Sequence, residues 1–129
     1  MKALALAAIA LAGTFGVAQA QAQDLAAGEQ SFRKCFPCHA VGPDARTKIG
    51  PVLNGLDGRK SGTTEGYSYS VANKKAEIVW SEETFRVYIE NPMQRMPGTK
   101  MAFPGIKDQK EVGDLWAYLK QFNMDGSKK

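Results

Sequence analysis

Cysteine and histidine are scarce in this 129-residue chain, which holds two cysteines and one histidine. A structural zinc site takes four ligands from these residue types, so Cys and His alone cannot build one here. No apolar run reaches the roughly 20 residues that a membrane-spanning helix needs. The formal net charge is +4 with no block of like charges, which indicates an acidic protein partner rather than nucleic acid.

The N-terminus has the three parts of a secretory signal peptide. Lys2 supplies the positive charge, residues 3–12 form a short apolar core, and small residues follow as far as residue 22. An Ala-x-Ala pattern permits cleavage after Ala20 or after Ala22. We therefore expect a signal peptide over residues 1–22, a mature domain over residues 23–129, and a periplasmic location.

Both cysteines and the histidine fall in one five-residue motif, Cys35-Phe36-Pro37-Cys38-His39. A disulfide is one alternative in an exported protein, but a thioredoxin-like Cys-x-x-Cys needs a βαβ context, and the chain has none. In covalent haem attachment the two thiols add to the haem vinyl groups and the adjacent histidine binds the iron. That interpretation uses all three residues at once, so we predict one haem c bound through Cys35, Cys38 and His39.

Four segments have helical patterns, and strand signals are weak throughout, which predicts an all-α fold. Each predicted helix has a polar N-cap, and at the last helix Asp108 and Glu111 can form a capping box. The helices are expected at residues 24–34, 71–75, 81–90 and 108–122. Gly28 within the first helix suggests close approach of another helix, because glycine otherwise costs helix stability.

The remaining segments are rich in glycine and proline. Residues 40–66 and 91–105 are expected to be irregular, which is unusual in a compact domain unless something organises them. A haem edge is a candidate organiser. Residues 126–129 are expected to be a mobile tail.

The second axial ligand cannot be histidine, which leaves methionine, lysine or tyrosine. Met93, Met96 and Met101 are the methionines in reach, whereas Met124 lies beyond the last helix. Composition does not choose among the three. Met101 lies in a loop between two Pro-Gly turns that could aim it inward, and Met96 is equally suited to filling the core.

Further segments extend the similarity beyond the attachment motif, in order along nearly the whole mature chain. They are Gly50-Pro51-Val52-Leu53-Asn54-Gly55-Leu56-Asp57-Gly58-Arg59-Lys60, Gly66-Tyr67-Ser68-Tyr69, Ala72-Asn73-Lys74, Trp80-Ser81-Glu82-Glu83-Thr84, Pro97-Gly98-Thr99-Lys100-Met101-Ala102-Phe103 and Asp114-Leu115-Trp116-Ala117-Tyr118-Leu119. With these segments the chain resembles the class I cytochromes c, and most closely the bacterial cytochromes c2 and their mitochondrial relatives.

The resemblance implies a role for each matching residue around the haem. Met101 corresponds to the distal iron ligand, and the carbonyl of Pro51 to the acceptor of the His39 ring N–H, which raises ligand basicity. The propionates would be bound by Arg59, Tyr69 and Trp80. The polar network on the methionine side would comprise Tyr88, Asn73 and Thr99, and Phe103 would cover the haem face.

The resemblance also implies contacts and differences. Gly28 and Phe32 should pack against Leu115 and Tyr118, where the first and last helices cross. Val52 stands where the family usually has asparagine. Other departures are Met93 and Gln94 in place of two lysines, Pro104 after the ligand loop, and the bulky Trp116.

Function follows from the resemblance in the same way. A six-coordinate iron with both axial positions filled has no open site for substrate, so we expect a monomeric single-electron carrier and not an enzyme. It would take electrons from a cytochrome bc1 complex and deliver them to a photosynthetic reaction centre or a terminal oxidase. A haem peroxidase with a displaceable methionine is the alternative, and a sensing module would need an output domain. The partner would meet a basic surface at the haem edge, formed by Arg33, Lys34, Lys48, Lys100 and Lys107.

Overall fold

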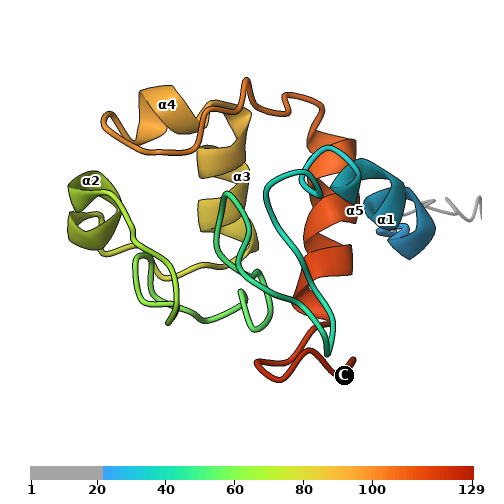
Figure 1. The fold of residues 1–129 in the computed structure, drawn as a ribbon. Helices are drawn as coiled ribbons and strands as arrows, with labels where there is room; N and C mark the ends of the chain where they lie inside the picture. Colours follow the sequence, from blue (N-terminus) through green and yellow to red (C-terminus); the bar gives the residue numbers. More distant parts are fainter. Residues whose placement is uncertain (1–21) are drawn as a thin grey trace, which may run out of the picture.

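The computed structural model describes residues 22–129, which form a domain of helices joined by long irregular segments (Figure 1). The predicted signal peptide lies outside the described residues, apart from its last residue, Ala22. The five helices of the described part are α1 (Leu25–Phe32), α2 (Val71–Lys75), α3 (Glu82–Glu90), α4 (Pro92–Arg95) and α5 (Gln109–Lys120). That part contains no strand, only the isolated bridges Lys60–Val79 and Phe122–Lys128. The predicted all-α class is therefore confirmed.

Side-chain caps fix where the helices begin. Asp24 accepts a hydrogen bond from the backbone of Ala27 at 3.0 Å. Ser81 and Thr84 satisfy each other's backbone N–H groups in a capping box at the start of α3. Asp108 caps α5 by accepting from Glu111 N at 2.9 Å. The second half of the capping box predicted there is wrong, because the Glu111 carboxylate instead accepts from Ser31 and Lys34 of the α1 region.

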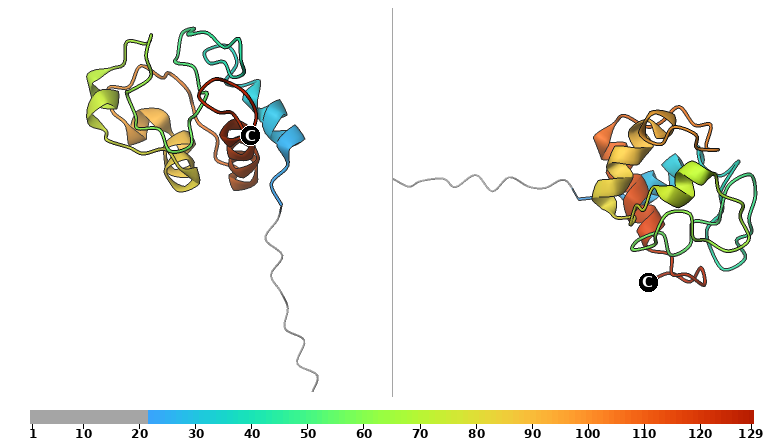
Figure 2. Two further views of the ribbon diagram at one scale, coloured as in Figure 1. Left: turned by 90° about the horizontal axis from the view of Figure 1, so that it is seen from below. Right: turned by 90° about the vertical axis from the view of Figure 1, so that its left-hand side faces the viewer.

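The first and last helices pack side by side, as predicted (Figures 1 and 2). A Cβ on Gly28 would lie 2.0 Å from the carbonyl oxygen of Asp114 and 2.8 Å from Cβ of Tyr118. The ring centroids of Phe32 and Tyr118 are 5.5 Å apart. Glycine at position 28 is therefore what allows the two backbones to meet.

Helix α4 lies within a segment that was predicted to be irregular. Asn91 caps it by accepting from Gln94 N at 3.2 Å, and Pro92 occupies the first turn. Pro92 follows the end of α3 and begins α4. It is tolerated in the first turn because the N–H groups there have no partner within the helix, so the N–H that proline lacks is not needed. Met96 follows directly and is only 4% exposed, which confirms it as a core residue.

The hydrophobic core lies between α3, α5 and the loops that face the pocket. Phe85 of α3 packs on Trp116 of α5 with ring centroids 5.3 Å apart. Val112, Leu115 and Leu119 complete the buried stripe of α5 that the sequence pattern predicts. Within the part of the chain that the structure describes, no helix is long and apolar enough to cross a membrane.

The C-terminal residues are ordered, so the predicted mobile tail is wrong. The chain reverses after α5, and Asn123 N donates to the carbonyl of Ser127 at 2.8 Å. Lys129 N then donates to the carbonyl of Gln121, also at 2.8 Å. Backbone pairing in a turn around Gly126, where φ is +83°, holds residues whose composition alone suggests a loose end.

Candidate functional site

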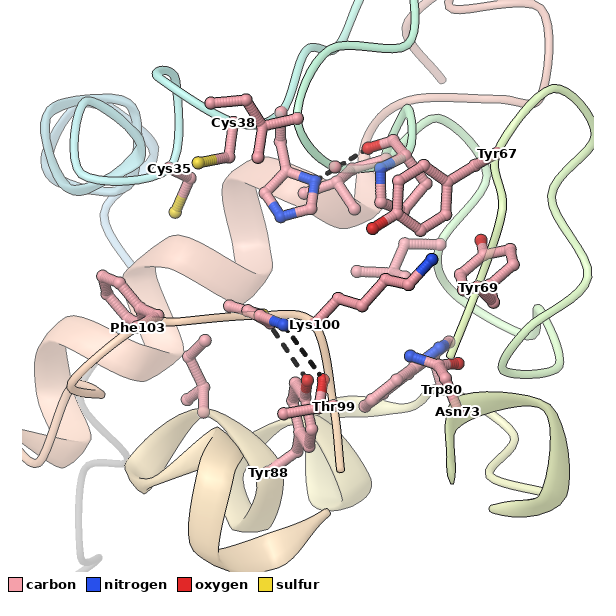
Figure 3. Close-up of a pocket in the computed structure, with 18 of the residues that line it drawn as sticks. Cys35, Cys38, Tyr67, Tyr69, Asn73, Trp80, Tyr88, Thr99, Lys100 and Phe103 are labelled. Atoms are coloured by element: carbon pink, nitrogen blue, oxygen red, sulfur yellow. Dashed lines mark hydrogen bonds between the residues drawn. The ribbon is translucent and has the colours of Figure 1, made fainter. Parts of the chain in front are cut away.

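A largely apolar cavity of about 220 Å³ opens between the Cys-x-x-Cys-His turn, the two irregular segments and helices α3 and α5 (Figure 3). Every site residue predicted from the sequence lines it. Those residues are Cys35, Cys38, His39, Pro51, Arg59, Tyr69, Asn73, Trp80, Tyr88, Thr99, Met101 and Phe103. The structure thus brings together side chains spread across most of the domain.

Tight turns that continue from α1 present the motif to the cavity. Cys38 N and His39 N both donate to the carbonyl of Cys35, at 3.0 and 2.8 Å. Both thiols are free, and Figure 3 shows them close together at one end of the pocket. Burial raises the pKa of the Cys35 thiol from 9.0 to about 11. Redox-active Cys-x-x-Cys motifs lower that pKa, so the raised value at Cys35 argues against a role in thiol exchange.

His39 is fixed in the tautomer that a metal ligand needs. Its Nδ1 lies 2.7 Å from the carbonyl oxygen of Pro51, and because a carbonyl can only accept, Nδ1 carries the hydrogen. The lone pair is then on Nε2, which has no hydrogen-bond partner among residues 22–129. Burial lowers the pKa of His39, against the raising effect of the Pro51 bond. The neutral ring is the form that binds iron.

Met101 is the one methionine of the described chain that lines the cavity. The Tyr88 hydroxyl donates to Met101 Sδ at 3.4 Å, and Met101 N donates to Thr99 Oγ1 at 3.2 Å. Burial raises the pKa of Tyr88, which keeps its phenol protonated and able to donate. Of the alternatives, Met93 is 51% exposed on α4 and Met96 is in the core.

Polar groups gather at the end of the pocket away from Cys35. Figure 3 shows Tyr69, Asn73 and Trp80 there, on the opposite side from Phe103. Arg59 Nη1 donates to the carbonyls of Val52 and Asn54, at 3.1 and 2.9 Å. Burial lowers the pKa of Arg59.

One buried group at this polar end lacks a partner. Asn73 Oδ1 is buried without a hydrogen-bond partner in the described chain. The two ends of an amide are interchangeable in shape, so Asn73 can turn its NH₂ toward an acceptor. This lining fits a ligand that has an apolar ring, two thiol-reactive substituents at one end and carboxylates at the other. Haem is such a ligand.

Sequence reasoning missed part of the lining. Tyr67 lies edge-on to Tyr69 with centroids 4.8 Å apart, and their spacing of two in an extended segment was the available signal. The other unassigned lining residues are mostly apolar ones from loops and from the inner faces of helices, where nothing in the sequence separates pocket from core. They include Ile49, Leu53, Leu56, Phe85, Ile89 and Leu119.

Three of the five cations expected at the pocket edge have partners within the described chain. Lys34 pairs with Glu111, and the Lys100 ammonium donates to the carbonyl of Ser68 at 2.7 Å beside Tyr67 and Tyr69 (Figure 3). The Lys48 ammonium bonds the Phe36 carbonyl and lies 3.7 Å from the centre of the Phe36 ring. Arg33 and Lys107 are exposed.

A small helical domain whose Cys-x-x-Cys-His turn opens onto such a pocket defines a class I c-type cytochrome. The family model that matches the chain is that of cytochrome c, over residues 25–123. Cytochrome c2 of Blastochloris viridis is 61% identical over 113 residues, which cover 88% of this chain and 89% of that protein. Cytochrome c-550 of Bradyrhizobium diazoefficiens is 56% identical over 101 residues, 78% and 74% of the two chains.

A solved structure agrees with the sequence relatives. Cytochrome cH from Methylobacterium extorquens superposes with a TM-score of 0.70 at 42% identity, covering 75% of this chain and 97% of that one. The chain therefore belongs to the cytochrome c family, within its cytochromes c2. It binds one covalent haem c, and it is an electron carrier and not an enzyme.

Proposed function

We propose that this chain is a periplasmic single-electron carrier whose haem iron is bound by His39 and Met101. The observation that carries the proposal is the placement of Met101, whose sulfur is held in the pocket by Tyr88 while Met93 and Met96 lie elsewhere. The haem supplies one-electron iron chemistry, and methionine as an axial ligand raises the reduction potential.

The chain's own residues attach, orient and seal the cofactor. Cys35 and Cys38 form the two thioethers, and Pro51 holds the His39 tautomer. Tyr88 and Thr99 orient Met101. The propionates would be held by Arg59, Tyr69 and Trp80. The unpartnered Asn73 amide, expected on the methionine side, lies beside Tyr69 and Trp80 in Figure 3 and would add a donor at that end. Phe103 lies beside Cys35 in the pocket (Figure 3), where it would cover the haem face.

Absorption spectra of both oxidation states test the ligand assignment. Met101→Ala removes the proposed ligand, so the charge-transfer band between methionine sulfur and ferric iron disappears. Met96→Ala keeps the band although it removes a core side chain, and Met93→Ala keeps it with little change in stability. Loss of the band in either control variant, or its survival in Met101→Ala, reassigns the ligand. A five-coordinate high-spin spectrum of the wild type overturns the closed-site carrier altogether.

The proposed partners are a cytochrome bc1 complex as donor and a photosynthetic reaction centre or a terminal oxidase as acceptor. Two apolar side chains near the motif, Phe36 and Ile49, are 61% and 75% exposed. Ile49 also lines the pocket, so a docked partner would meet apolar surface as well as charge. Rates of reduction by isolated bc1 complex and of oxidation by each acceptor test this docking face. The face is supported if all three complexes react with the protein and Phe36→Ser slows both reduction and oxidation.

The export proposal concerns residues 1–22 and a mature domain over residues 23–129. Lys2, the apolar segment and the two Ala-x-Ala sites support it. An intact mass of protein isolated from the periplasm distinguishes cleavage after Ala20 from cleavage after Ala22. A mass that still contains residues 1–22 contradicts the proposal.

A further inference from the structure

The segment that carries His39 and Pro51 is a closed loop over residues 38–55, called here the histidine loop. Its two arms are joined by Gly50 N donating to the carbonyl of Cys38 at 2.8 Å and Leu53 N donating to that of Ala40 at 3.0 Å. The Asn54 side chain adds two bonds of 2.9 Å to the N–H and the carbonyl of Gly42. The separation of the arms therefore fixes the distance between the His39 ring and the Pro51 carbonyl.

The C-terminal tail, residues 122–129, lies against both arms of this loop. Gly55 N donates to the carbonyl of Phe122 at 3.0 Å. A Cβ on Gly55 would lie 2.1 Å from Met124 Sδ, and a Cβ on Gly126 would lie 2.0 Å from the carbonyl oxygen of Gly42. The tail thus contacts one arm at Gly42 and the other at Gly55, without touching the pocket itself.

We propose that the C-terminal tail is a positioning clasp for the axial histidine. By holding the two arms together, it keeps the Pro51 carbonyl at 2.7 Å from His39 Nδ1. A carbonyl at that distance raises the basicity of the imidazole as a ligand, so the tail tunes the iron through the loop. The inference rests on the proposed ligation by His39.

Gly126→Ala tests the clasp with a single added methyl group. Position 126 has φ +83°, and the new Cβ meets backbone that cannot move without opening the contact with Gly42. Gly58→Ala is the matched control, because its φ of +85° imposes the same backbone strain while nothing lies within 4 Å of the added Cβ. A chain that ends at Asn123 is the second variant and removes both Met124 and Gly126.

The readouts are amide hydrogen exchange and the reduction potential of the haem-loaded protein. In Gly126→Ala and in the shortened chain, we expect the Gly50 and Leu53 amides to exchange about tenfold faster, with the α1 and α5 amides unchanged. The potential rises, because a weaker bond to Pro51 makes His39 a poorer donor to ferric iron. Gly58→Ala changes neither quantity in this way.

Two results overturn the clasp. One is an equal increase in exchange across α1, α5 and the histidine loop, which indicates only a loss of global stability. The other is unchanged exchange of Gly50 and Leu53 in both tail variants. The ligation by His39 is tested separately, on the wild type. If His39 does not bind the iron, its ring protons lack the large NMR chemical shifts of an iron ligand.

Discussion

Gly28→Ala tests how tightly the two terminal helices must meet. The added Cβ would lie 2.0 Å from the Asp114 carbonyl oxygen, and 3.0 Å is about the closest approach that such a pair tolerates, so the helices must separate by about 1 Å. Overpacking of this kind costs about 1–3 kcal/mol. The shift also weakens the Phe32–Tyr118 contact, worth about 1 kcal/mol.

Hydrogen bonds across the same interface add to that cost. Asp24 N donates to Asp114 Oδ1 at 2.8 Å, and Ser31 donates to Glu111 at 2.7 Å, each worth about 1 kcal/mol. Against this, alanine gains about 1 kcal/mol of helix propensity over glycine. The net expectation is a loss of about 3–5 kcal/mol in the free energy of unfolding.

Denaturant unfolding of the haem-loaded protein measures this loss as a lower midpoint at an unchanged slope. The matched control is Gly113→Ala within α5, where the added Cβ meets side-chain atoms and no backbone, with Arg86 Nη2 at 2.6 Å and Gln23 Nε2 at 3.5 Å. That control should be neutral or slightly stabilising. If Gly28→Ala is as stable as Gly113→Ala, the backbone contact does not limit the packing of α1 on α5 and the reasoning fails.

Three further predictions concern the pocket, acid stability and docking. Tyr88→Phe removes the hydroxyl that donates to Met101, which makes the sulfur a better donor to ferric iron; voltammetry should show a lower reduction potential, and an unchanged value contradicts the contact. Hydrogen bonds, first from Asp24 N and then from Lys110, lower the pKa of Asp114 below 3.8 in the folded state. Its contribution to stability is therefore complete above pH 3.8 and is lost as the pH falls through the lower folded pKa. In acid unfolding, Asp114→Asn should lower neutral stability and flatten this decline, and a parallel curve refutes the assignment. Finally, oxidation by the partner should slow as the salt concentration rises, because salt screens the charges that steer association. The slope should be shallow because Lys34 and Lys100 already have partners, and stopped-flow rates that do not depend on salt remove the steering.

The sequence predicted much of this structure because several of its signals are local. Capping side chains such as Asp24 and Ser81 satisfy backbone groups within three residues, so the starts of helices are readable. The role of Gly28 could be predicted for a different reason. A glycine within a helix lowers helix stability, and a close contact with another helix explains why it is there.

The errors came from long-range contacts. The Glu111 carboxylate could accept a hydrogen bond at the start of its own helix. It accepts instead from the hydroxyl of Ser31, which lies 80 residues away in sequence. The tail around Gly126 is polar and glycine-containing, and besides its own backbone hydrogen bonds it packs against Gly42, which is far from it in the sequence. The site residues needed family resemblance for the same reason, because nothing local distinguishes Tyr88 or Asn73 in the pocket from an ordinary core residue.

The contact between α1 and α5 has a consequence for the order of events during synthesis. Asp24 and its partner Asp114 are 90 residues apart, and contacts of such high sequence separation form only after the intervening chain is complete. The chain therefore cannot close this domain until its last helix is present. Until then Cys35 and Cys38, which lie just after α1, remain in an unclosed polypeptide in which both thiols are accessible.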